Sequence, residues 1–169
     1  MQPRANPILE LGNHAKARQI LRQLAGALDF GWYDAAVFDV ARRWVLLGEC
    51  HLRNAKARAA KPREWRALVS RTYYAAYNVS RSVRYVVTGS VRLDVKDHQE
   101  VGELPDDFPD RALWSTFLVD LRKDRNLADY EPWKDMRMGL SHRPSESVRK
   151  VAVFIRTAKA YLRGRGVQL

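Results

Sequence analysis

The chain has 169 residues, 46% of them hydrophobic, which suits a single domain that buries roughly 70% of its unfolded surface. Thirty Lys and Arg against nineteen Asp and Glu give a formal net charge of +11, and an excess of this size indicates an anionic partner. A lone cysteine, Cys50, excludes an internal disulfide, and no apolar run is long enough to predict a membrane span or a secretory signal. We therefore expect a cytoplasmic protein with no membrane contact.

The charge is unevenly distributed along the chain. Residues 94–110 contain seven acidic side chains and one Lys, so the rest of the chain carries about +17. The four histidines and the cysteine are scattered, and the carboxylates of this acidic segment are as readily explained by a solvated surface. We expect no metal and no cofactor.

The apolar residues recur at helical spacing in five segments. The pattern predicts a first helix over 13–28 that ends by Gly31, and a second that begins at Asp34 as its N-cap and continues to about residue 57. Its core stripe is expected to include Val37, Val40 and Leu47.

The second half of the chain follows the same pattern with clear helix boundaries. Pro62 opens a third helix that Gly89 ends, and a fourth helix is predicted over 110–130. Between them, 90–109 reads as a long loop with a short helical turn near 97–104. Pro144 opens the last helix.

These elements define the expected fold and domain organisation. The fold is all-α, an antiparallel bundle of four main helices plus an N-terminal helix. Residues 1–33 form an N-terminal helical extension and residues 34–169 form the bundle.

Two polar segments stand out on the third and fourth helices. The first reads Ser-Arg-Thr-Tyr-Tyr-Ala-Ala-Tyr-Asn over 70–78, and the second reads Leu-Arg-Lys-Asp-Arg-Asn-Leu-Ala-Asp-Tyr over 121–130. The pair resembles the signature of small bacterial and archaeal HEPN domains (higher eukaryote and prokaryote nucleotide-binding), over about residues 34–165. Such proteins also have a His followed shortly by a Val, as in His98-Gln99-Glu100-Val101.

The resemblance implies a site for metal-independent RNA cleavage at the end of the fourth helix. In the superfamily an Arg is followed directly by a polar residue and, four to six residues after the Arg, by a His. Arg125 and Asn126 fit this motif, and Tyr130 stands where the His is expected. The Arg would stabilise the charged phosphorane in a cleft shared by two protomers, while the base would take the 2′-hydroxyl proton. A phenol is almost entirely protonated at pH 7 and is therefore a poor base.

Other histidines could replace the missing one. His142 follows Arg137 by five residues and could fold back into the cleft, whereas His98, six residues after Arg92, lies in the acidic loop, far from the usual helix end. Chance alone produces one or two such matches in a chain this rich in Arg. An intrahelical contact between Arg125 and Asp129 is the plain alternative to a catalytic role.

The third helix carries a stripe of arginines and aromatics that could stack bases and grip phosphates, although a solvated helix face would show the same pattern. The expected nucleic-acid-binding residues are Arg71, Tyr74, Asn78, Arg81 and, on the fourth helix, Arg122.

The resemblance therefore predicts a homodimeric protein that binds or acts on RNA. It implies a toxin-like component paired with a nucleotidyltransferase, which can neutralise its partner by binding it or by modifying a Tyr near the Arg motif. Because the motif lacks its His, we expect ribonuclease activity to be weak or absent, and Tyr130→His to raise it. The alternatives are a catalytically silent helical module that binds a nucleotidyltransferase or a nucleotide, and a basic accessory protein of a defence system.

Overall fold

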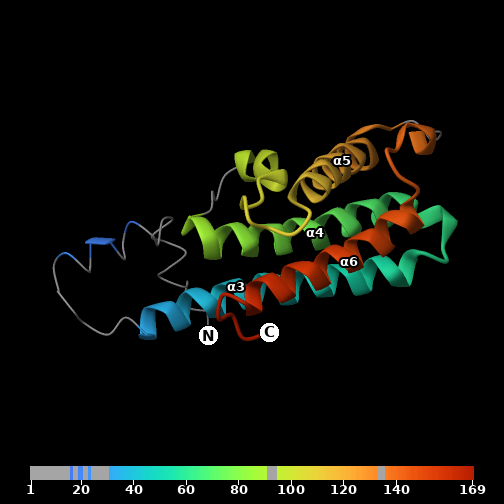
Figure 1. Ribbon diagram of the computed structural model, residues 1–169. Helices are drawn as coiled ribbons and strands as arrows, with labels where there is room; N and C mark the ends of the chain where they lie inside the picture. Colours follow the sequence, from blue (N-terminus) through green and yellow to red (C-terminus); the bar gives the residue numbers. More distant parts are fainter. Residues whose placement is uncertain (1–15, 17–18, 21–22, 24–30, 91–94, 133–135) are drawn as a thin grey trace.

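The computed structural model describes residues 16, 19, 20, 23, 31–90, 95–132 and 136–169. Within these residues the fold is all-α, as predicted, and no β-strand is formed. The four long helices are α3 (Gly31–Arg58), α4 (Trp65–Thr88), α5 (Arg111–Tyr130) and α6 (Pro144–Arg163), and the short 3-10 helices are η1 (Pro62–Glu64), η2 (Val95–Gly102) and η3 (Met136–Gly139) (Figure 1). Most of the predicted helix at 13–28 and of the predicted extension at 1–33 lies outside the described residues.

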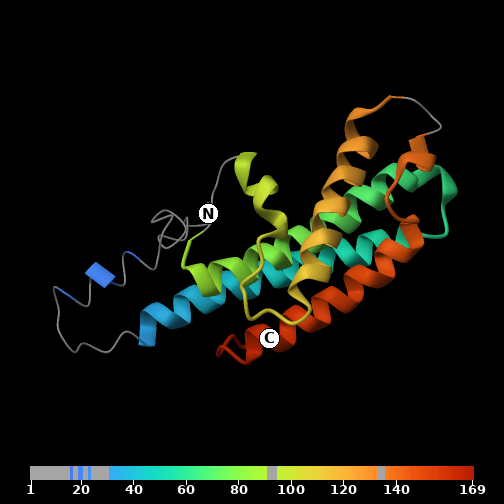
Figure 2. The ribbon, with the colours of Figure 1, turned by 45° about the horizontal axis from the view of Figure 1, so that its top comes forward.

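Helix α4 is the central element of the bundle, because it packs against α3, α5 and α6. It runs antiparallel to α3, to which η1 connects it (Figure 1). α3 and α6 lie on one side of α4, and α5 and η2 lie on the other, with α5 crossing α4 at a clear angle (Figure 2). The side of α4 that faces α5 and η2 is the one that carries the Tyr-rich segment.

Two predictions about α3 were wrong. The helix begins at Gly31, so Asp34 lies in the first turn and is not the N-cap. Leu47 is 45% exposed, although Val37 and Val40 are buried as predicted. The buried side is instead continued by Gly48, where an added Cβ would meet the Val79 side chain of α4 at 2.6 Å, so only a glycine allows this close approach.

The other helix boundaries agree with the sequence pattern. Gly89 ends α4 in the left-handed conformation (φ 73°), and its N–H donates to the Tyr85 carbonyl at 3.1 Å. Pro144 occupies the first turn of α6, where its missing N–H costs no hydrogen bond. These signals were local, which is why the sequence sufficed to predict them.

The predicted short turn in the acidic segment is η2, and it is built into the core. Val101 is fully buried, and Ser80 of α4 donates a hydrogen bond to its carbonyl at 2.7 Å. At Gly102 an added Cβ would meet the Ser115 carbonyl of α5 at 2.9 Å, so η2 also approaches α5 closely. η2 thus joins α4 and α5 on the side of the bundle opposite α3 and α6. None of the described helices is long and apolar enough to cross a membrane.

Candidate functional site

An open pocket of about 620 Å³ lies where α4, α5 and η2 meet. Its walls combine cationic, aromatic and imidazole side chains, and the lining residues are Tyr73, His98, Gln99, Arg122, Arg125, Asn126 and Tyr130. The three elements that form it are separate segments of the sequence, so the pocket exists only in the folded chain.

Arg125 lines this pocket and is held in place by its neighbours. Its Nη2 donates to the Tyr74 hydroxyl at 2.8 Å, and its Nε lies 2.8 Å from a carboxylate oxygen of Asp129. The guanidinium carbon is 5.0 Å from the centre of the Tyr130 ring, a cation–π distance. The Arg125 side chain is only 16% exposed, so these contacts fix its position while part of it remains accessible.

His98 faces the same pocket from η2. Its Nδ1 lies 2.7 Å from the Tyr73 hydroxyl, and its ring stacks on that of Tyr77, with the centres 4.3 Å apart and the planes 14° apart. Arg122 donates to the His98 carbonyl at 3.3 Å, which ties η2 to α5. Both the ring and the backbone of His98 are therefore held in place by α4 and α5.

Burial and the nearby Arg125 guanidinium lower the pKa of His98, so that its imidazole is neutral at pH 7. Burial also raises the pKa of Tyr73, whose phenol therefore stays protonated. When Nδ1–H of His98 donates to the Tyr73 oxygen, Nε2 is the basic nitrogen. The pocket then contains a neutral base together with Arg125, which remains cationic at any physiological pH.

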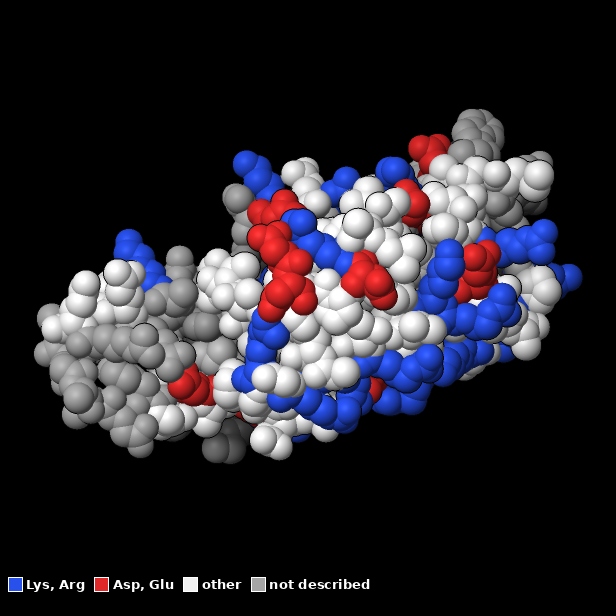
Figure 3. Space-filling model, in the orientation of Figure 1, with Lys and Arg blue, Asp and Glu red and all other residues white. Residues whose placement is uncertain are grey.

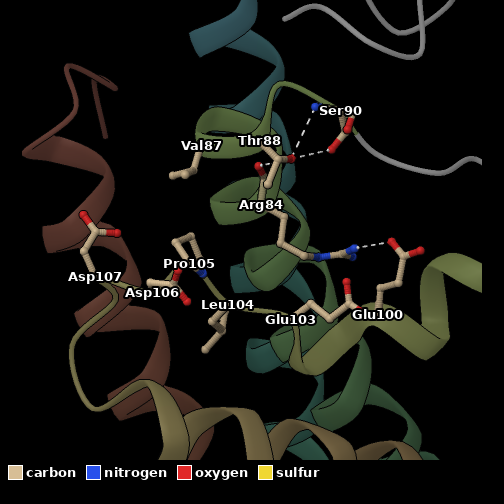
Figure 4. Close-up of a pocket in the computed structure, with 10 residues that line it drawn as sticks. All are labelled: Arg84, Val87, Thr88, Ser90, Glu100, Glu103, Leu104, Pro105, Asp106 and Asp107. Atoms are coloured by element: carbon tan, nitrogen blue, oxygen red, sulfur yellow. Dashed lines mark hydrogen bonds and ion pairs between the residues drawn. The ribbon is translucent and has the colours of Figure 1, made fainter.

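Buried ion pairs anchor η2 to α4 next to His98. Asp97 is 1% exposed, accepts a hydrogen bond from the Tyr77 hydroxyl at 2.5 Å and lies 3.0 Å from Nη2 of Arg84. The other end of the same guanidinium reaches Glu100 at 3.1 Å, as Figure 4 shows. Arg84 thus holds two carboxylates of η2, and the two residues between them along the chain, His98 and Gln99, both line the pocket.

The structure brings together some of the predicted site residues and separates others. Arg122, Arg125, Asn126 and Tyr130 line the pocket, and Tyr74 contacts it through its bond to Arg125.

The remaining residues of the α4 stripe lie apart from this group. Arg71 is exposed, and its Nη1 lies 3.3 Å from Nδ1 of His51 on α3. Asn78 is only 5% exposed and its side-chain amide donates to the Tyr74 carbonyl, so most of this predicted nucleic-acid-binding side chain is enclosed. Arg81 is 15% exposed and lies 3.5 Å from Asp97, so its side chain serves mainly to anchor η2.

The expectations for the two alternative histidines were reversed. His142 does not fold back into the cleft: it lies in a separate pocket with Phe117 and Asp120, its Nε2 3.8 Å from the Asp120 carboxylate. His98, placed by sequence far from the end of the Arg helix, lies beside Arg125 instead. Asp97 and Val101, which are buried on either side of His98, position η2. In the sequence, only the His-x-x-Val pattern indicated that His98 lies near the motif.

Comparison with known proteins adds no assignment, because no family model, curated protein or solved structure matches the chain. Among the residues that the structure describes, no group of three or more His, Cys, Asp or Glu side chains could hold a metal ion. The chemistry that the pocket itself offers is that of two arginines, a neutral imidazole and phenols. Such a set can bind an anion, stabilise added negative charge and accept a proton.

Proposed function

We propose that the protein is a HEPN-type protein that binds RNA in the pocket between α4, α5 and η2, and that His98 supplies the imidazole missing from its Arg-Asn motif. The observation that carries this proposal is the shared pocket: His98, Arg125 and Asn126 line one cavity although η2 and α5 are separate in sequence. The lowered pKa of His98 supports the role, because a base must be unprotonated at working pH.

The proposed reaction is transesterification of the RNA backbone. His98 takes the proton of a ribose 2′-hydroxyl, the oxygen attacks the adjacent phosphorus, and the 5′-oxygen leaves and takes up a proton from water. Arg125 and Arg122 stabilise the negative charge that builds up on the phosphoryl oxygens. The products are a 2′,3′-cyclic phosphate and a free 5′-hydroxyl, and this chemistry needs no metal.

The test is cleavage of a single-stranded RNA in the presence of EDTA. We expect His98→Ala to lower the rate by about 10²- to 10⁴-fold, the usual contribution of a general base. Arg125→Ala should abolish cleavage, and His142→Ala is the matched control that should leave it unchanged. The rate should fall on acidification only as pH drops through the lowered pKa of His98, below the ordinary value of 6.5.

Three results would contradict this assignment. Cleavage that survives both His98→Ala and Arg125→Ala comes from another site or another protein. Cleavage that is lost in His142→Ala alone would make His142 the base, despite its separate pocket. Cleavage by the Tyr130→His variant together with an inactive wild type would support the original expectation, that the motif is degenerate because it lacks its His.

A second candidate function follows from Tyr130, which is 68% exposed at the end of α5, where the motif His is expected. An exposed phenol beside an arginine suits a partner contact as well as a phosphate contact. In this alternative the protein binds a nucleotidyltransferase, as the HEPN resemblance implies for a toxin-like component, and cleaves nothing. Binding of RNA without cleavage by the wild type would favour it.

A further inference from the structure

A second cationic surface lies on the side of the bundle away from the pocket. Figure 3 shows Lys and Arg side chains gathered in a band over α6 and the neighbouring α3. We define the basic face as Arg53 and Lys56 of α3 with Arg149 and Arg156 of α6, all of them exposed. The pocket, by contrast, is formed by α4, α5 and η2.

The two helices place these four cations along one seam. Arg149 and Arg156 are seven residues apart, two helical turns or about 10 Å along the same side of α6. Glu49 of α3 pairs with Lys159 of α6 at 2.6 Å, and Arg53 and Lys56 lie one and two turns beyond Glu49 on its side of α3. This ion pair fixes the register of the two helices.

The four residues of the basic face are not neutralised within the described part of the protein. None has a carboxylate within ion-pair distance there, whereas the nearby acids are already used: Glu146 pairs with Lys150, and Glu49 with Lys159. These four side chains are exposed on the solvent side of their helices, so the fold does not require them to be buried or ordered. A cluster of unneutralised cations on a rigid support attracts a polyanion.

Among the described residues this face carries no exposed aromatic side chain, and this limits the kind of polyanion that fits it. Single strands are bound largely by stacking on aromatic side chains, but the aromatics of α6, Phe154 and Tyr161, are buried. Amphipathic membrane-surface helices present Trp, Phe or Leu along their cations, whereas the exposed apolar side chains here are only Val153 of α6 and, two turns before Arg53, Leu46 of α3. A duplex offers rows of backbone phosphates and no accessible base faces, which matches a surface dominated by guanidinium and ammonium groups.

We propose that the basic face binds the phosphate backbone of a nucleic-acid duplex, at a site independent of the pocket. Because backbone charge is common to RNA and DNA duplexes, the experiment includes both. The duplex that binds with the higher affinity identifies the natural ligand. The proposal stands whether or not the pocket cleaves RNA.

The experiment measures fluorescence anisotropy of labelled 20-base-pair RNA and DNA duplexes and of a 20-nucleotide oligouridine between 50 and 200 mM KCl. The test variant is R53Q/K56Q/R149Q/R156Q. The matched control removes four other exposed cations, R43Q/K61Q/R63Q/K123Q, and so has the same net charge. Circular dichroism and thermal unfolding establish that both variants are folded.

We expect the test variant to bind the preferred duplex at least tenfold more weakly at 100 mM KCl, and the control to change less than threefold. The slope of log K against log salt should become shallower by about 3.6, since each of the four phosphate contacts contributes about 0.9. Arg125→Ala should leave duplex affinity unchanged, which separates this site from the pocket.

Three outcomes would overturn the proposal. Equal losses in the two variants would show that net charge alone drives binding. Unchanged duplex affinity in the test variant would show that the face is only solvated. Tighter binding to phosphatidylserine vesicles than to either duplex, with loss in the test variant, would assign the face to a membrane surface.

Discussion

At the scale of single residues, the contact that most affects the proposed chemistry is the one between Tyr73 and His98. The Tyr73 hydroxyl lies 2.7 Å from Nδ1, and the Tyr77 ring stacks on the imidazole, so the ring has little freedom to turn. Tyr73 is therefore a positioning residue: when its oxygen accepts the hydrogen bond from Nδ1–H, Nε2 is the nitrogen that is free to accept a proton.

Tyr73→Phe should lower RNA cleavage roughly fivefold, because a hydrogen bond of about 1 kcal/mol no longer orients the base. The pH profile of the cleavage rate, measured from pH 5 to 8, separates a positioning role from an effect on stability. A positioning role should shift the acidic limb of this profile. Tyr161→Phe is the matched control, because it also removes one partly buried tyrosine hydrogen bond. That bond runs from the Tyr161 hydroxyl to Asp107 at 2.6 Å and lies away from the pocket. Equal effects of the two changes would show that Tyr73 acts only through stability.

At the scale of elements, η2 carries the histidine but depends on α4 for its position. Asp97 is 1% exposed and faces the guanidinium groups of Arg84 and Arg81 at 3.0 and 3.5 Å. Removing one member of such a buried set leaves the others as uncompensated charges, which is far more costly than losing an exposed pair.

Asp97→Asn should therefore lower the free energy of unfolding by about 3 kcal/mol and release η2 from α4. Urea unfolding measures the first effect, and hydrogen exchange of 95–102 measures the second. Asp107→Asn is the control, because the Asp107 side chain is 63% exposed in its pair with Arg165 and its loss should change the free energy of unfolding far less. Unchanged exchange in η2 of the Asp97 variant would show that apolar contacts alone hold this element.

At the scale of the whole molecule, the HEPN resemblance predicts a dimer that joins the ends of two α5 helices. Tyr130, the last residue of α5, is 68% exposed, and Leu113 in its first turn is 63% exposed, so both ends present an apolar side chain. Facing arginine clusters repel each other, and salt or bound RNA should therefore strengthen this contact.

Sedimentation velocity at micromolar concentration should show a dimer that Tyr130→Lys weakens at least tenfold and that Leu113→Lys leaves intact. The physical reason is that another cation at the predicted contact would add to the repulsion between the facing arginine clusters. A monomer at both 50 and 500 mM salt would rule out a cleft shared between protomers. Loss of the dimer in Leu113→Lys alone would place the interface at the other end of α5.

The sequence by itself determined the all-α fold, most helix boundaries and the Arg-Asn motif. Helical periodicity, the αL glycine after Thr88 and the proline that opens α6 are local signals, written in neighbouring residues. The positions of Arg122, Arg125, Asn126 and Tyr130 follow from the same periodicity, because they share one side of a single helix end.

Only the tertiary structure decided which histidine joins that motif. His98 and His142 both satisfied the spacing, and no local pattern says which of two loops will pack beside α5. The choice is made by burial: Asp97 and Val101 are enclosed on either side of His98, with Arg84 as the counter-charge from α4. Such pairings join residues more than ten positions apart, and their energies exist only once the helices have packed.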